Sequence, residues 1–118
     1  MQKAFLVFFI ACTLSSSAFS QTRQQVPATR FWNLTPFILS EFNLAPAGTT
    51  NWGSNQCKND RDGTVSPNER LRITDTAPGI YDAKLKDTTG RVCFACNLKV
   101  ETNEIFSIEE RDLVNCQP

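Results

Sequence analysis

The 118-residue sequence contains no histidine. Without an imidazole, the chain cannot build a Ser-His-Asp or Cys-His catalytic pair, a histidine-ligated zinc site or a histidine pH switch. It also lacks a charge excess, because 12 Lys+Arg balance 12 Asp+Glu. A basic surplus that would favour nucleic acid is therefore absent. Nothing in the sequence matches a phosphate-binding loop or a cofactor fingerprint, so we expect no cofactor and no enzymatic activity.

The first 20 residues have the order of a secretory signal peptide. A short basic start precedes the apolar run from Ala4 to Ala11, and small residues follow at Ala18 and Ser20. We predict cleavage after Ser20 and a periplasmic or secreted protein of bacterial type. The apolar run is far shorter than the roughly 20 residues of a transmembrane helix, so no membrane span is expected. One alternative stays open, in which a lipobox precedes Cys12 and this cysteine is lipidated.

The rest of the chain shows the pattern of short strands. Residues 21–29 are polar and predict a flexible leader, whereas residues 30–118 predict a single β domain. Apolar and polar residues alternate, or aromatic residues cluster, in 30–34, 38–44, 70–74, 81–86, 92–100 and 105–108. The predicted fold is all-β: an antiparallel β-sandwich or small barrel of about six or seven short strands, with two disulfides.

The cysteines carry the most specific structural prediction. In the segment 92–100, Cys96 shares a face with four apolar residues, so we predict that this face meets the core and that Cys93 points outward. An extended strand separates the Cα atoms of Cys93 and Cys96 by about 10 Å, which is beyond the reach of a disulfide. Four cysteines allow three pairing schemes, and two of them remain. We predict the scheme with the two disulfides Cys57–Cys96 and Cys93–Cys116.

Two chemical alternatives stay open for the cysteines. Cys93 and Cys96 have the CxxC spacing of thiol-disulfide oxidoreductases. That chemistry needs the first cysteine at a helix N-terminus, and the strand pattern here favours structural disulfides instead. A metal site built from all four cysteines of the β domain is the second alternative.

The segment from Lys58 to Glu69 partly matches a twelve-residue calcium loop. Asp60 and Asp62 would occupy the third and fifth positions, and Glu69 would occupy the twelfth. The first position, normally aspartate, holds the cation of Lys58. We therefore expect a polar loop and no metal site, and keep these three carboxylates as weak candidates for a calcium-dependent binding module.

Two aromatic segments are candidates for contact with a partner. Trp52 stands in a turn-rich segment, and on a β-sandwich such a loop is a plausible surface for binding a protein or a glycan. The alternative is that Trp52 plugs the end of the sandwich. Arg30, Phe31 and Trp32 could form a stacking platform for nucleic acid, but core packing of these aromatic residues is favoured and no nucleic acid is expected.

Several short motifs follow one another in a fixed order. They are Asn33-Leu34-Thr35, Leu44-Ala45-Pro46-Ala47-Gly48, Trp52-Gly53, Ser66-Pro67-Asn68-Glu69 and Tyr81-Asp82. This order resembles a group of small exported alphaproteobacterial β-sandwich proteins of unknown function, which share an Asn-x-Thr turn, an SPxGxxxWG stretch, a PGE turn and a YD strand. The resemblance implies export and a β-sandwich over about residues 30–108, but no activity. Asn68 stands where that turn usually has glycine, and the cysteine positions are particular to this chain.

Taken together, these patterns predict an exported, non-catalytic binding protein or accessory envelope protein.

Asn33 begins a glycosylation sequon, but Pro36 follows it directly. We therefore expect Asn33 to be a turn residue.

Overall fold

A computed structural model describes residues 28–118, so the predicted signal peptide and most of the predicted leader lie outside the described residues. The strands are β1 (Arg30–Leu34), β2 (Leu39–Pro46), β3 (Arg70–Arg72), β4 (Gly79–Asp87), β5 (Val92–Val100), β6 (Ile105–Glu109) and β7 (Val114–Gln117). Two short 3-10 helices, η1 (Gln56–Asn59) and η2 (Glu110–Asp112), complete the described fold. None of the helices in this part of the chain is long and apolar enough to cross a membrane.

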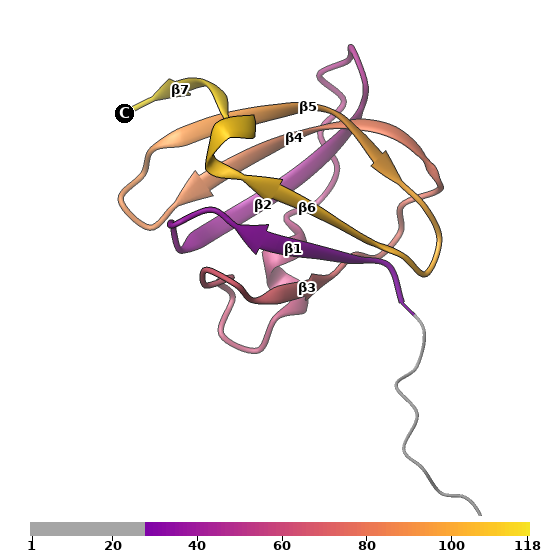
Figure 1. The fold of residues 1–118 in the computed structure, drawn as a ribbon, viewed down its shortest axis with the longest axis horizontal. Coiled ribbons are helices and arrows are strands. Elements are labelled where there is room, and N and C mark those ends of the chain that lie inside the picture. Colours follow the sequence, from indigo (N-terminus) through magenta and orange to yellow (C-terminus); the bar gives the residue numbers. More distant parts are fainter. Residues whose placement is uncertain (1–27) are drawn as a thin grey trace, which may run out of the picture.

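The strands form two packed sheets, which confirms the predicted all-β sandwich (Figure 1). One sheet has the order β3-β1-β6 and the other the order β2-β4-β5-β7. Every pair is antiparallel except β1 and β6, which run parallel with Phe31 opposite Phe106. A parallel pair needs a long connection, and here the chain between β1 and β6 contains β2, η1, β3, β4 and β5.

Three phenylalanines fill the space between the sheets. Phe31 of β1 stacks on Phe42 of β2 with ring centroids 4.1 Å apart and ring planes 6° from parallel. Phe106 of β6 lies 5.7 Å from the first ring and 6.4 Å from the second. Because the two partners of the stack come from different sheets, these rings bury large apolar surfaces and hold the two layers together.

A β-bulge interrupts β5. The register shifts so that Cys96 and Asn97 both stand opposite Asp82 of β4. Asn97 takes a left-handed φ of 58° and donates its backbone N–H to Oδ1 of Asp82 at 3.1 Å. An extra residue reverses the alternation of a strand, so the two halves of β5 face the core with residues of opposite parity. Val100, after the bulge, is buried as predicted.

The bulge makes the predicted face of β5 wrong in its first half. Cys93 is buried and Cys96 is exposed, the reverse of the prediction. The Cys93–Cys116 disulfide is present, as predicted, but Cys93 reaches it from the buried side of the strand. The predicted Cys57–Cys96 disulfide is wrong: Cys57 is fully buried in η1, Cys96 lies on the surface, and both are free thiols.

Asn33 is a buried structural residue at the end of β1. Its Nδ2 donates to the carbonyl oxygens of Phe37 at 2.9 Å and Val65 at 3.1 Å. Its Oδ1 accepts the backbone N–H of Thr35 at 3.0 Å and the hydroxyl of Thr35 at 2.7 Å. These bonds use the amide fully and shape the turn after β1, which is the role predicted for this residue.

Candidate functional site

The sandwich has two ends that differ in structure. In the antiparallel pair of β2 and β4, Leu39 stands beside Asp87 at one end and Pro46 stands beside Tyr81 at the other. We call the first the hairpin end, because it contains the turn between β4 and β5. We call the second the groove end. Loops at either end are the places where a β-sandwich usually carries its function.

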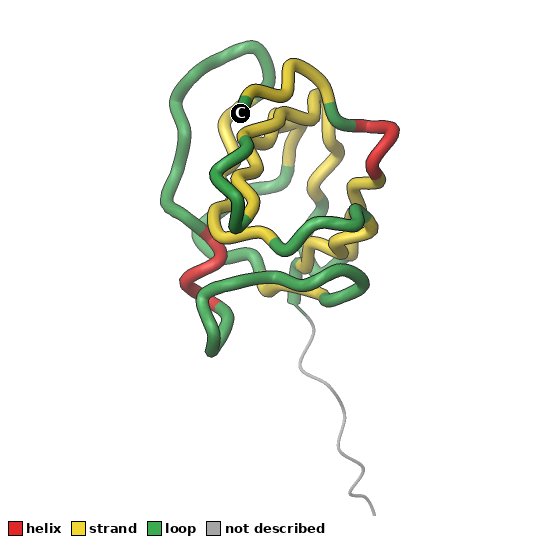
Figure 2. The backbone as a smooth tube through the Cα atoms, turned by 90° about the vertical axis from the view of Figure 1, so that its left-hand side faces the viewer, coloured by secondary structure: helices red, strands yellow, loops and turns green. Residues whose placement is uncertain are grey.

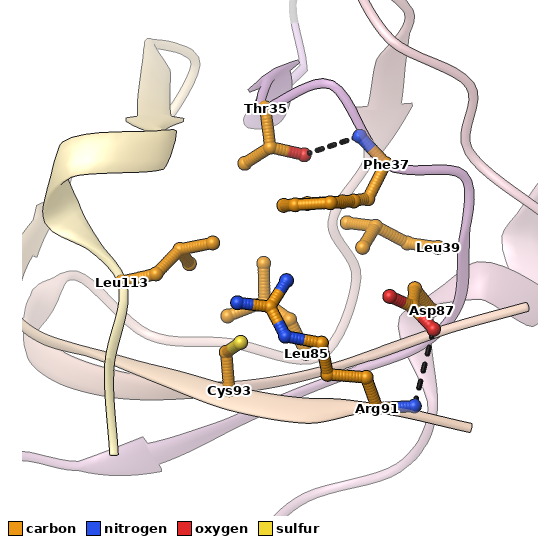
Figure 3. Close-up of a pocket in the computed structure, with 8 residues that line it drawn as sticks. All are labelled: Thr35, Phe37, Leu39, Leu85, Asp87, Arg91, Cys93 and Leu113. Atoms are coloured by element: carbon orange, nitrogen blue, oxygen red, sulfur yellow. Dashed lines mark hydrogen bonds between the residues drawn. The ribbon is translucent and has the colours of Figure 1, made fainter. Parts of the chain in front are cut away.

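The hairpin end has little free space. Its cavity has a volume of only about 10 Å³ and is lined by Thr35, Phe37, Leu39, Leu85, Asp87, Arg91, Cys93 and Leu113 (Figure 3). The guanidinium of Arg91 lies 4.8 Å from the centre of the Phe37 ring. A space of this size holds about one water molecule, so the hairpin end has no room for a ligand.

The turn at the hairpin end is organised by one carboxylate. Oδ1 of Asp87 accepts the backbone N–H of Thr89 at 2.8 Å, the hydroxyl of Thr89 at 2.6 Å and the backbone N–H of Arg91 at 3.1 Å. The hydroxyl bond, more than any other contact, lowers the pKa of this carboxyl. Asp87 is thus held as a carboxylate for a structural purpose.

The groove end is open. A groove of about 270 Å³ is lined by Leu44, Pro46, Asn51, Gly53, Ser54, Gln56, Asp75, Thr76 and Tyr81. Its lining includes Tyr81, whose hydroxyl donates to the carbonyl of Ala77 at 2.6 Å. The polar lining residues carry amide, hydroxyl and carboxylate groups. This mixture of an aromatic ring and polar groups is typical of small-ligand sites.

The loop after β2 forms one rim of the groove, and Figure 2 shows it as a wide arch that leads into a short helix. Near its start, the N–H of Gly48 donates to Oδ2 of Asp82 at 2.9 Å. Near its end, the N–H of Gly53 donates to the carbonyl of Leu44 at 2.9 Å. Hydrogen bonds therefore fix both ends of the loop, while Asn51 between them is exposed.

The floor of the groove is a rigid hydrogen-bonded network. Gln56 of η1 is 4% exposed, and its Nε2 donates to the carbonyl of Thr74 at 2.9 Å. Its Oε1 accepts the backbone N–H of Thr74 at 3.0 Å and Nδ2 of Asn59 at 2.7 Å. Because the buried amide is satisfied within the protein, Gln56 positions the two loops on either side of it.

Trp52 lies on the outer face of the four-stranded sheet. Its ring is 5.9 Å from the ring of Phe94, and Nζ of Lys84 is 5.4 Å from its centre. It thus packs outside the sandwich and does not plug the space between the sheets. Its neighbours Asn51 and Gly53 line the groove, although Trp52 itself does not. Its role as a ligand anchor stays a prediction.

Two of the three carboxylates of the calcium-like loop accept hydrogen bonds within the loop. Oδ2 of Asp60 accepts the N–H of Asp62 at 3.0 Å, and Oε1 of Glu69 accepts the N–H of Ser66 at 2.7 Å. Partial burial, together with the nearby Asp60, raises the pKa of Glu69. Within residues 28–118, no group of three or more His, Cys, Asp or Glu side chains is arranged to hold a metal ion.

The free and bonded cysteines have different chemistry. The CxxC segment does not form its own disulfide, because Cys93 is bonded to Cys116. Burial, followed by the charges of Asp60, Glu41 and Glu69, raises the pKa of Cys57 from 9.0 to about 12. Its Sγ donates to the carbonyl of Leu39 at 3.7 Å. Cys57 is therefore an inert thiol inside the fold.

Most of the groove was missed by the sequence analysis. Asp75, Thr76 and Tyr81 belong to a segment that predicts only a turn followed by a strand. No pattern in the sequence indicates that this segment meets the loop after β2. Comparison with family models, curated proteins and solved structures finds no match for this chain.

Proposed function

We propose that this chain is an exported, non-catalytic binding protein whose groove holds a sugar-sized unit of a glycan. The observation that carries the proposal is the pairing, in one groove of about 270 Å³, of a tyrosine ring with amide, hydroxyl and carboxylate side chains. A pyranose ring has apolar C–H faces that pack on an aromatic ring and hydroxyl groups that bond to such polar groups. The groove offers both at once.

The size of the groove supports a small occupant. Pockets for drug-sized ligands usually span about 300–1,000 Å³, so this groove suits a single ring. A groove that makes only a small number of contacts binds weakly. We expect dissociation constants of about 1 mM, which correspond to a binding free energy of roughly −4 kcal/mol.

Export is supported by the first 20 residues and by the Cys93–Cys116 disulfide, since such bonds form in oxidising compartments. The absence of histidine from the whole sequence supports a non-catalytic role. Intact-mass analysis of the protein recovered from a bacterial periplasm tests export: a chain beginning at Gln21 supports it. A chain that keeps Met1, or a lipid on Cys12, contradicts the proposed cleavage.

Amide-detected NMR titration with a panel of neutral and acidic monosaccharides and disaccharides tests the groove. We expect one sugar class to shift the signals of Asn51, Thr76 and Tyr81. Asp75→Asn, which tolerates the φ of 53° at this position, and Asn51→Ala should each weaken binding about tenfold.

The matched control is Thr50→Ala, an exposed position on the same loop that does not line the groove. This variant should bind as the parent protein does. Shifts confined to another surface, or no shifts with any sugar at tens of millimolar, would overturn the proposed site.

A further inference from the structure

A second surface, remote from the groove, gathers arginines from two distant segments. On the outer face of the three-stranded sheet, Arg30 of β1 stands opposite Arg72 of β3, and Trp32 stands opposite Arg70. Arg70 and Arg72 are exposed, whereas Leu71 between them is buried. We call Arg30, Trp32, Arg70 and Arg72 the arginine face.

The tryptophan of the arginine face is held in place. Nε1 of Trp32 donates to Oδ1 of Asn68 at 3.0 Å, and Asn68 has a left-handed φ of 71°. The guanidinium of Arg70 lies 4.3 Å from the centre of the indole ring. A guanidinium stacked in this way keeps its in-plane N–H donors available for a carboxylate.

Two of these cations have no anionic partner in the described part of the chain. Within residues 28–118, no hydrogen bond or ion pair joins the guanidinium of Arg70 or Arg72 to another side chain. On the outer face of the other sheet, two lysines do have such partners: Lys86 pairs with Glu41 at 3.5 Å and Lys99 pairs with Glu101 at 3.2 Å.

The composition of the arginine face resembles a protein-binding surface. In the neighbouring strand β6, Ile105 stands beside Arg30 and is 50% exposed. Ser107 stands beside Trp32 in the same register. Arginine and tryptophan are enriched at protein interfaces, where lysine is depleted.

We propose that the arginine face docks an extended acidic segment of a protein partner. Residues at positions i and i+2 of a strand lie about 7 Å apart on one face, which is the spacing of Arg70 and Arg72. An extended peptide with a carboxylate at every second residue has the same repeat. Each carboxylate can then form paired hydrogen bonds with one guanidinium.

Charge favours a short acidic segment over a long polyanion. The whole chain carries 12 basic and 12 acidic side chains, so it has no net positive charge to attract a long polyanion. A segment with two or three carboxylates matches the patch in size. This inference does not depend on the groove, and either can fail without the other.

Two synthetic hexapeptides of identical composition test the spacing. The first alternates threonine and glutamate, and the second carries three glutamates followed by three threonines. We expect the alternating peptide to shift the indole N–H signal of Trp32 in an NMR titration and to bind about fivefold more tightly than the blocked peptide.

Charge-reversal variants test the residues. Arg72→Glu should weaken binding of the alternating peptide about tenfold, and Arg72→Gln provides the same test without a new charge. Arg70→Lys keeps the charge but loses the planar fork, so it should also weaken binding. The control is Lys99→Glu, an exposed change of equal charge on the other sheet, which should leave the affinity within about twofold.

Several results would overturn the proposal. Equal binding of the two peptides, or equal weakening by Lys99→Glu, would show non-specific charge attraction. Tighter binding of a heparin hexasaccharide or of phosphatidylglycerol vesicles at the same salt concentration would assign the face to a polysaccharide or a membrane. No shift of the Trp32 signal at millimolar peptide would remove the site altogether.

Discussion

The hairpin end and the groove end close the same pair of strands in different ways. At the hairpin end, β4 and β5 are joined by a four-residue connection, residues 88–91, that a single carboxylate ties together. At the groove end, the connections that follow β2 and β3 come from separate parts of the chain and are fixed at their feet. The first arrangement leaves about 10 Å³ and the second about 270 Å³. Room for a ligand arises where long connections meet without filling the space between them.

The largest expected effect compares the two free thiols. Cys57 is buried in η1, with its thiol against the carbonyl of Leu39, whereas Cys96 is exposed at the bulge of β5. A pKa raised from 9.0 to about 12 leaves Cys57 with roughly a thousandfold less thiolate at pH 8, and burial also blocks access. Timed alkylation with iodoacetamide followed by peptide mass spectrometry should show Cys96 reacting about a thousandfold faster or more.

Denaturation in urea should abolish this difference, which provides the control. Similar rates for Cys57 and Cys96 in the folded protein would contradict the assigned faces of η1 and β5. Protection of Cys96 would show that the surface assigned to it is covered.

The next effect concerns the disulfide at the hairpin end. The Cys93–Cys116 bond joins β5 to β7 and closes a loop of sequence separation 23. Replacing both cysteines by alanine should lower the free energy of unfolding by about 3 kcal/mol, because the unfolded chain loses this constraint. Urea denaturation measures the change. Cys96→Ser, at an exposed thiol, should change the stability by less than about 0.5 kcal/mol, and equal effects of the two changes would contradict a structural role for the bond.

The sequence predicted the strands well because alternation depends on local spacing. It failed at β5, where five apolar residues alternate without a break and still do not share a face. The cause is Asn97, which takes a left-handed conformation that asparagine tolerates better than most residues. In this chain the left-handed Asn97 marks the bulge, and the bulge decides which cysteines can meet.

The candidate sites depended on contacts that no local pattern contains. The turn-rich segment around Trp52 was recognised as a surface loop, but its meeting with Asp75 and Tyr81 follows from how β2, β3 and β4 are placed. The alternation of Arg70 and Arg72 was visible, whereas Arg30 joins them only through the pairing of β1 with β3. Strand pairing between distant segments is the information that a single sequence lacks.

The third prediction concerns Asn55, which anchors the rim of the groove end. Its Oδ1 accepts the backbone N–H groups of Phe42 and Cys57, both at 3.0 Å, and its Nδ2 donates to the carbonyl of Ser40 at 3.2 Å. Asn55→Ala leaves these strand and helix groups without partners and should cost about 2 kcal/mol of stability. Thermal denaturation of this variant, with Asn51→Ala as the control that changes stability by less than about 0.5 kcal/mol, measures the effect. A loss confined to ligand binding would contradict this anchoring role.

The smallest effect depends on pH and returns to the hairpin end. Three hydrogen bonds lower the pKa of Asp87 below its ordinary value of 3.8, so the folded protein binds this proton less readily than the unfolded chain does. The stability that Asp87 contributes is therefore fully present above about pH 4 and is lost as the pH falls through its lowered pKa.

Asp87→Asn keeps the side-chain oxygen but not the charge, and should lower the free energy of unfolding by about 1 kcal/mol at pH 7. Glu69, whose pKa is raised, acts in the opposite direction and favours the folded state at low pH. Because Glu69 is present in both proteins, the difference between parent and variant unfolding free energies isolates Asp87. This difference should shrink as the pH falls below about 4 and through the lowered pKa of Asp87. A difference that stays constant over that range would show that the charge of Asp87 does not support the turn.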